Sequence, residues 1–333
     1  MADAQSTADQ ETLKALIFQR LHPRIYLERF IAENVRPDGR EFAEWRDITV
    51  NVGSISTADG SALVRLGDTT IVCGVKAEIA EPELDRPNAG FLVPNIDLPA
   101  MSSPKFKPGP PSEEAQVLSD RLNNVLVSCA FPPLRITIIL TPFLFPFRVF
   151  FFLSTTSSGV IPLDSLCIHP GKAVWVLYVD ATCINYDGNA FDAALVAMVS
   201  ALKNSLSLFL FLLTPEEMEI ALFTAAHLPK ATFDEDTGRT TCSRKIRTPL
   251  AISRLPLSLS FGLFDSSHLL ADPTSFEEPL VDTTFSVVLD QDHDLISLTQ
   301  LGLTDSRTQD ILSTCIEAAK QRHRTLDNKI YSF

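Results

Sequence analysis

The amino-acid sequence predicts an α/β fold, an α+β sandwich of two related halves that each combine a β-sheet with helices. Three observations lead to this prediction. Residues 47–80 alternate polar and apolar side chains between turn signals, as a strand meander does. Residues 112–130 and 189–204 carry apolar side chains at helical spacing. Strand-like segments recur between 240 and 298, and a helical pattern from Thr304 to Ile330 follows them.

Length and composition fit a chain with a large buried core. The chain has 333 residues, 45% hydrophobic and 21% charged, which suits one large domain or two closely packed ones. Its six cysteines are scattered, without a C-x-x-C pair, so we expect buried reduced thiols rather than a zinc site or a disulfide framework. The first residues are acidic and polar, so no signal peptide is expected at Met1. The sequence contains no Gly-rich nucleotide loop, and we expect no cofactor.

The charge of the chain bears on its class of function. The formal net charge is −13. A protein that binds nucleic acid on its own gains its affinity by neutralising phosphates with Lys and Arg, so this charge argues against such a protein. It is compatible with one small basic patch in a larger assembly. We therefore expect a role within an assembly.

The chain before the first strand predicts a kinked helix. Residues 1–9 are polar and are expected to be disordered. The globular domain is expected over 10–330. From Gln10 to Asn34 apolar residues recur at helical spacing, and Pro23 is expected to interrupt or kink the helix. The simplest interpretation of this stripe is a helix that only covers core.

The first half of the domain is expected at about 36–130. Asp47 to Gly53 predicts a half-buried strand, and the turns Asp59-Gly60 and Gly67-Asp68 predict two hairpins that complete a three-strand meander. A short strand is expected at 91–98. Ser112 is the expected N-cap of a helix that continues to about residue 130.

The second half is expected at about 160–330. Lys172 to Ile184 is a long, strongly apolar strand, and Asn185-Tyr-Asp-Gly188 predicts a turn into the next helix. Small residues in that helix, at 189–204, indicate close packing against a sheet. Further strands are expected at 240–248, 257–265, 268–271, 285–290 and 295–298.

Two hydrophobic segments are atypical insertions, at about 131–159 and 205–227. The first contains seven phenylalanines and four prolines. A membrane helix over 136–153 is disfavoured, because it would contain Pro142, Pro146 and Arg148 and would interrupt a soluble fold. Phe, Leu and Ser share pyrimidine-rich codons, as in the tract before a splice acceptor. We therefore hypothesise that both insertions are retained introns or gene-model errors.

Long motifs carry a resemblance to a known family. Arg36-Pro-Asp-Gly-Arg40, Gly53-Ser-Ile-Ser-Thr-Ala-Asp-Gly-Ser-Ala-Leu-Val64 and Gly67-Asp-Thr-Thr-Ile-Val-Cys-Gly-Val-Lys-Ala-Glu78 closely resemble RNase PH-like proteins. Asn95-Ile-Asp-Leu-Pro99, Gly109-Pro-Pro-Ser-Glu-Glu-Ala-Gln116 and His169-Pro-Gly-Lys-Ala-Val-Trp-Val-Leu-Tyr178 resemble the ring subunits of the eukaryotic RNA exosome. The resemblance covers roughly 15–130, 160–204 and 228–330. It implies the RNase PH-like fold, with the N-terminal helix outside the first sheet.

The resemblance also implies partners. It implies a hetero-hexameric ring of RNase PH-like exosome subunits, RNA-binding cap subunits on that ring, and RNA threaded through it towards attached nucleases. The activities it implies are rRNA maturation and RNA turnover, in nucleus, nucleolus and cytoplasm. It implies no membrane partner.

The resemblance places acidic residues of interest near the end of the second half. RNase PH-type enzymes use phosphate to attack the last phosphodiester of RNA, which requires groups that hold phosphate and acids or a metal. Asp272 and Glu278 match the catalytic acids in position, and Asp282 matches a further acidic position. Active relatives hold phosphate with arginines in two regions, which here read 107–118 and 187–191 and contain none.

Carboxylates without a phosphate cradle would repel both phosphate and RNA. We therefore expect Asp272, Glu278 and Asp282 to be structural or vestigial, and the chain to be an inactive homologue. The alternative is an active phosphate-dependent 3′–5′ exoribonuclease that takes its phosphate ligands from a neighbouring subunit.

Four basic residues are candidates for contact with RNA. Lys105 and Lys107 lie in a loop that faces the channel in the family. Arg244 and Lys245 belong to a basic run at 239–247, for which a solvated strand face is as good an interpretation. The histidines have no metal-binding spacing, so no metal site is expected.

Overall fold

The computed structural model describes residues 13–127, 149–154, 159–204, 227–234, 239–249, 252–302 and 308–330. The expected disordered N-terminus, at 1–9, lies outside this part of the chain. So do most of the two expected insertions, at 131–159 and 205–227.

The first sheet contains the predicted meander. β1 (Ile48–Val52), β2 (Gly60–Leu66) and β3 (Thr69–Ala80) pair in antiparallel order. The long strand β7 (Ala173–Asn185) pairs antiparallel to β3, and β4 (Phe91–Asp97) pairs parallel to β7. The short β6 (Cys167–His169) also pairs with β7, after a 3-10 turn at Leu163–Leu166. The strands predicted in this half are confirmed.

The second sheet is entirely antiparallel. Its order is β11 (His268–Ala271), β10 (Leu257–Phe264), β12 (Thr283–Leu289), β13 (Leu295–Gly302) and β5 (Val149–Ser154). The predicted hairpin of β10 and β11 is confirmed. β5 falls inside the first expected insertion and pairs with β13. β8 (His227–Asp234) and β9 (Arg239–Pro249) form a separate two-stranded sheet.

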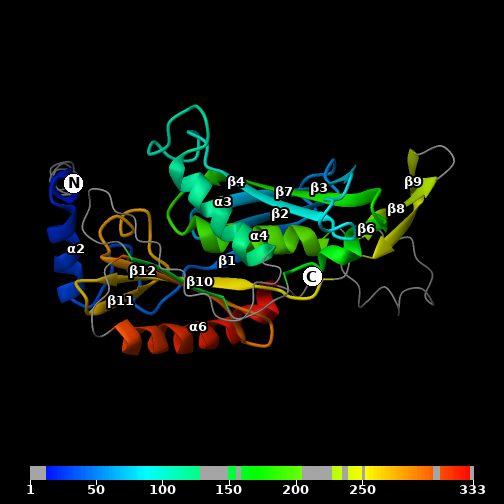
Figure 1. Cartoon of the computed structure of the whole chain (residues 1–333). Helices are drawn as coiled ribbons and strands as arrows, with labels where there is room; N and C mark the ends of the chain where they lie inside the picture. Colours follow the sequence, from blue (N-terminus) through cyan, green and yellow to red (C-terminus); the bar gives the residue numbers. More distant parts are fainter. Residues whose placement is uncertain are drawn as a thin grey trace.

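Helix α4 (Ala190–Asn204) lies between the two sheets, and every residue of it except Lys203 is buried. Its predicted small side chains let it contact β2, β3 and β10, so one hydrophobic core extends from the first sheet to the second. Helix α3 (Glu113–Leu126) lies beside β4, and the Ser112 side chain accepts a hydrogen bond from Ala115 N as its predicted N-cap. Helix α6 (Thr308–Ile330) covers the far face of the second sheet (Figure 1). The α/β sandwich is confirmed.

The N-terminal helix is kinked where the sequence predicts it. Residues 13–21 are helical, and α2 (Pro23–Ala32) begins with Pro23 in its first turn, where the missing N–H costs nothing. Leu27 and Ile31 pack with Phe264 and Leu270. The helix therefore lies outside the first sheet and rests on the second half of the molecule.

Two remaining expectations concern cysteines and membranes. The described cysteines are free thiols, and most are buried, but Cys242 is exposed and departs from the expectation. No helix in the described part of the chain is long and apolar enough to cross a membrane.

Candidate functional site

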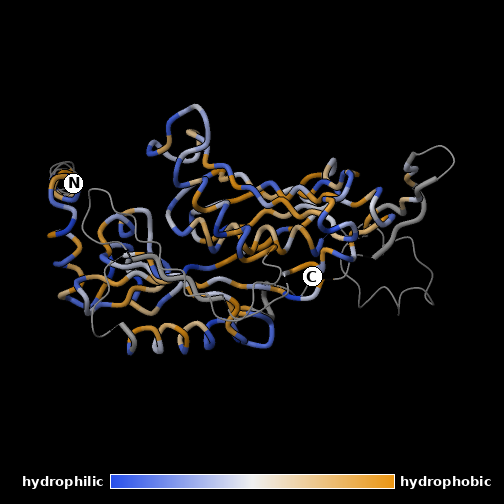
Figure 2. Tube along the Cα trace, in the orientation of Figure 1, coloured by the Kyte–Doolittle hydropathy of each residue, from blue (hydrophilic) through white to orange (hydrophobic). Residues whose placement is uncertain are grey.

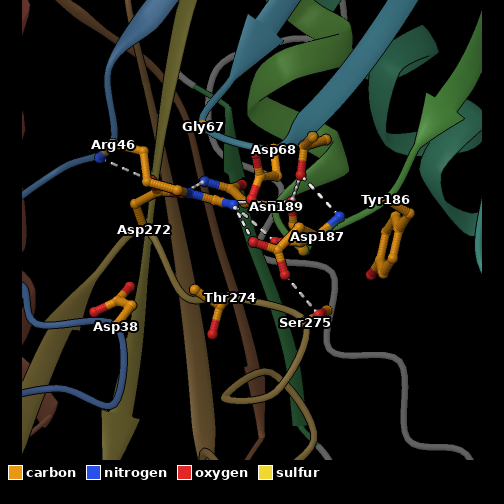
Figure 3. Close-up of polar contacts among 12 residues, drawn as sticks. Asp38, Arg46, Gly67, Asp68, Tyr186, Asp187, Asn189, Asp272, Thr274 and Ser275 are labelled. Atoms are coloured by element: carbon orange, nitrogen blue, oxygen red, sulfur yellow. Dashed lines mark hydrogen bonds and ion pairs between the residues drawn. The ribbon is translucent and has the colours of Figure 1, made fainter. Parts of the chain in front are cut away.

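Asp272, the first candidate acid, lies just after β11 and is fully buried. Its carboxylate accepts hydrogen bonds from Arg46 Nε and Nη2, both at 2.7 Å, in a bidentate ion pair. It also accepts from the backbone N of Arg46 at 3.1 Å and from Asn189 Nδ2 at 2.7 Å (Figure 3). Both carboxylate oxygens are thus occupied by groups of the chain itself.

The electrostatics of Asp272 follow from these contacts. Burial opposes ionisation of the carboxyl, but the hydrogen bonds and positive charge of Arg46 outweigh burial and hold the pKa of Asp272 below its ordinary value. Asp272 is therefore an ionised, neutralised partner of Arg46 at neutral pH. A general acid or base needs a pKa nearer to the working pH.

A second buried ion pair lies beside the first. The side chains of Arg36 and Glu277 are 0% and 1% exposed, and Arg36 donates to both carboxylate oxygens of Glu277. Arg36 also donates from Nη1 to the backbone oxygen of Ala271 at 2.6 Å and from Nη2 to that of Asp272 at 3.0 Å. Arg36 of the Arg-Pro-Asp-Gly-Arg motif therefore holds the loop that carries Asp272.

Glu278, the second candidate acid, meets the start of α4. Its Oε2 accepts from the hydroxyl of Tyr186 at 2.6 Å, and its Oε1 accepts from the backbone N of Asn189 at 2.7 Å. Burial raises the pKa of Glu278, although these two hydrogen bonds oppose the rise. Asn189 directly precedes α4, where free N–H groups and the helix dipole favour a negative charge. The carboxyl of Glu278 fills part of this anion-binding position.

Asn189 connects the two acids to the helix. Its Nδ2 donates to Asp272 Oδ1 and to Asp192 Oδ2 at 2.8 Å. Asp192 in turn accepts from the backbone N of Ser260 at 2.8 Å and from its hydroxyl at 2.7 Å. The residues at 36–46, 187–192 and 272–278, together called the inter-half seam here, form one polar network between β1, α4 and the second sheet.

The backbone at Gly188 shows how closely the parts of the seam approach. Gly188 has a φ of +79°, and a Cβ placed on it would lie 2.5 Å from Ser275 N and 2.6 Å from Thr274 C. Glycine is required there both for the backbone angle and for the close approach. The Asp187-Gly188 turn is therefore also a packing contact.

Of the other candidates, Lys105 lies close enough to Glu278 for its charge to favour ionisation of that carboxyl, whereas Asp282 lies elsewhere. Asp282 does not join the network of Asp272; its side chain is 24% exposed, it lies 3.6 Å from Arg24 Nη1, and it accepts from Asp265 N at 2.9 Å. Lys105 Nζ lies 2.8 Å from Glu114 Oε1 and 5.5 Å from the ring centre of Tyr186. Lys107 is exposed. Arg244 and Lys245 are in β9, and their side chains lie outside the described part of the structure.

The sequence predictions missed the arginines that matter most in the seam. For phosphate ligands, the resemblance points only to the two regions, 107–118 and 187–191, that hold phosphate in active relatives. The arginines that meet Asp272 and Glu277 come instead from the segment just before β1, where Arg36, Arg40 and Arg46 fall within eleven residues. The clustering of these three arginines at the Arg36–Arg40 family motif is the sequence signal that could have identified them.

A small cavity borders the seam. A cavity of about 20 Å³ lies beside Arg46, Asn189 and Asp192, enough for roughly one water molecule. Among the described residues, no group of three or more His, Cys, Asp and Glu side chains could hold a metal ion. The network can thus position backbone segments. Its described arginines are already paired with internal carboxylates rather than with a bound anion.

Two family models and several known proteins match this chain. Models of the 3′ exoribonuclease family match residues 44–206 (domain 1) and 254–322 (domain 2). An exosome complex component, rrp43 of Schizosaccharomyces pombe, is 37% identical over 92% of this chain and 94% of its own length. The Rrp42 component of Pyrococcus furiosus is 30% identical over 80% of this chain and 78% of its length. The motifs at 95–99, 109–116 and 169–178 likewise resemble ribosomal RNA-processing protein 43.

Solved structures agree with the fold. A chain of the Archaeoglobus fulgidus exosome with RNA bound to the active site is 28% identical, with a TM-score of 0.65 over 92% of this chain and 96% of that one. A chain of an archaeal exosome core is 23% identical, with a TM-score of 0.64 over 95% of this chain and 98% of that one. The RNase PH-like fold expected from the motifs is confirmed.

Proposed function

We infer a structural role from the membership of this chain in the 3′ exoribonuclease family, to which it belongs, and propose that it is a non-catalytic subunit of a eukaryotic RNA exosome core ring. Its relatives across most of its length are exosome components. In this role the chain supplies ring geometry and part of a channel wall, while associated nucleases process and degrade RNA.

The observation that supports an absence of catalysis is that the acids and arginines of the seam bind one another. Asp272 is neutralised by its ion pair with Arg46, and Arg36 is neutralised by its ion pair with Glu277. The N–H before α4, a position suited to phosphate, is occupied by the carboxyl of Glu278. A phosphate ion would have to displace an internal carboxyl from a buried site. We propose that Asp272 and Glu278 instead hold the two halves of the molecule together.

The proposed partners are other RNase PH-like subunits in a hetero-hexameric ring, RNA-binding cap subunits, and RNA threaded through the ring. Lys105 and Lys107 remain the proposed RNA contacts of the first half, and Arg244 and Lys245 those of β9. Such contacts add a few charges to a shared channel, which is compatible with the net charge of −13. The proposed activities are rRNA maturation and RNA turnover, in nucleus, nucleolus and cytoplasm.

Phosphorolysis is the activity to test. The purified chain, alone and within the ring, is incubated with RNA in phosphate buffer, and release of nucleoside diphosphates is measured. We expect no phosphate-dependent release that depends on this subunit. Release that is abolished by Asp272→Asn and by Glu278→Gln, in rings that still assemble, would overturn the proposal and establish the exoribonuclease alternative.

A further inference from the structure

The N-terminal arm, defined here as residues 13–32, presents an apolar stripe to solvent. Its five most exposed apolar side chains are Leu13 (58% exposed), Leu16 (56%), Ile17 (49%), Leu21 (68%) and Ile25 (46%). Positions i, i+3, i+4, i+8 and i+12 lie on one side of a helix. The expectation of a helix that only covers core is therefore wrong for this stretch.

The arm is held in shape across its kink. Backbone hydrogen bonds run from His22 N to Phe18 O at 2.9 Å and from Tyr26 N to His22 O at 3.0 Å, so the helical pattern continues past Pro23. The Phe18 ring lies 5.7 Å from that of His22 and 6.4 Å from that of Tyr26. The guanidinium of Arg29 lies 4.6 Å over Phe18. Interactions on both sides of the kink therefore fix the exposed stripe relative to α2.

The base of the arm is anchored on the second sheet. Leu27 and Ile31 are 0% and 5% exposed against Phe264 and Leu270, and the ring of Tyr26 meets that of Phe276 edge-on at 5.9 Å. The arm stands at the end of the molecule beside β11 and β12 (Figure 1), and apolar positions recur along it (Figure 2). The stripe is thus presented from a fixed base, which reduces the ordering cost of binding.

The charges of the arm indicate the chemistry of its partner. Four basic residues, Lys14, Arg20, Arg24 and Arg29, accompany one acidic residue, Glu28, in a chain whose net charge is −13. The arm is therefore a basic segment of an acidic protein. A complementary surface offers apolar side chains with carboxylates around them.

We propose that the arm is a docking element for a neighbouring RNase PH-like subunit, with the Leu16–Leu21 stripe buried in an apolar groove that acidic side chains surround. The inference rests on the proposed ring role. RNA offers charge and base faces rather than a groove for Leu and Ile side chains. Binding to anionic lipid depends on many basic side chains, and Arg24 and Arg29 already contact Glu28 and Phe18 within the chain.

The test uses the full chain co-expressed with the other ring subunits. Leu16→Glu/Leu21→Glu is compared with Leu84→Glu, a matched control in which a fully exposed leucine outside the arm gains the same charge. Because the substituted side chains are exposed, neither variant is expected to change the melting temperature of the isolated chain. We expect the arm variant to lower recovery in assembled rings about 30-fold, because each glutamate would bury an unpaired charge in the apolar groove, and the control to assemble like the wild type.

A charge variant adds an independent readout. Lys14→Glu/Arg20→Glu should weaken assembly at low salt and should differ little from the wild type at high salt, because exposed charges are screened. Normal ring assembly of the Leu16→Glu/Leu21→Glu variant would overturn the docking proposal while leaving the ring role intact. Absence of the wild-type chain from rings would overturn both. Loss of binding to phosphatidylserine vesicles or to RNA in the arm variant, with assembly unchanged, would assign the stripe to that ligand instead and would also overturn the proposal.

Discussion

Asp272 and Arg46 meet across 226 positions of sequence. The pair is buried, and each partner is satisfied further, Asp272 by Asn189 and Arg46 by the backbone oxygen of Asp187 at 2.7 Å. Removing one partner of such a pair leaves an unpaired charge in the interior, which costs far more than the net contribution of the intact pair. At the residue scale, the acid that resembles a catalytic residue is thus a structural connection between distant segments.

We expect Asp272→Ala to lower the free energy of unfolding by about 3–5 kcal/mol, because Arg46 would stay buried without its carboxylate. The matched control is Asp68→Ala, which removes an ion pair with Arg65 whose side chains are 72% and 60% exposed. That change should cost less than about 1 kcal/mol. Urea unfolding of the purified variants measures both values. Equal losses for the two variants would contradict the structural role of Asp272.

The lowered pKa of Asp272 makes a pH-dependent prediction. A carboxyl with a folded-state pKa below its ordinary value adds stability at pH above the ordinary value, and loses it as the pH falls through the folded-state pKa. We expect the difference in unfolding free energy between the wild type and Asp272→Asn to be constant near pH 7 and to shrink below about pH 4. Denaturant unfolding between pH 7 and pH 3 measures it. A difference that stays constant over that range would count against an ionised Asp272.

Gly188 connects β7 to α4 and packs against the loop after β11. Gly188→Ala forces a methyl group into the backbone of residues 273–275. Gly171→Ala is the matched control, because Gly171 has a similar φ of +73° and its Cβ would meet nothing within 4 Å. The control should cost about 1 kcal/mol from backbone strain alone, and Gly188→Ala at least about 2 kcal/mol more. Similar melting temperatures for the two variants would mean that the loop can retreat without cost.

The long strand β7 has two different faces. Val179 is 0% exposed and belongs to the main hydrophobic core, whereas Val176 lies on the opposite face of the sheet and is 6% exposed. We expect Val179→Asp to abolish folding by burying an unpaired charge, and Val176→Asp to lower soluble yield strongly as well. Soluble expression and circular dichroism report both effects. Normal ring incorporation of either variant would contradict the placement of β7 in the core.

Local patterns predicted the elements well for physical reasons. Alternation between Gly-containing turns marks half-buried strands, and Ser112 before two acids marks a helix start. The pattern from Gln10 to Asn34 identifies an amphipathic helix but does not indicate which neighbour covers which face. The docking of α2 on the second sheet, and the meeting of Arg46 with Asp272, depend on tertiary packing between distant segments. Asp272 and Glu278 were identified from their positions along the chain, but Arg46, the partner of Asp272, was not.

At the scale of the whole molecule, the inter-half seam and α4 join two sheets into one core. Most of the two expected insertions, about 131–159 and 205–227, lies outside the described residues, while 149–154 forms the edge strand β5. The retained-intron hypothesis predicts that tryptic peptides within 136–153 are absent from the endogenous protein. Mass spectrometry that detects such a peptide would contradict the hypothesis and would make β5 part of the mature sheet.

The central claim is that this chain is a structural subunit of an exosome ring. Affinity purification of the endogenous tagged protein, followed by mass spectrometry of its partners, tests it most directly. We predict recovery of other RNase PH-like subunits together with cap subunits. Recovery of the protein without those partners, in a form that degrades RNA when phosphate is supplied, would contradict the claim and make Asp272 and Glu278 the centre of a catalytic mechanism.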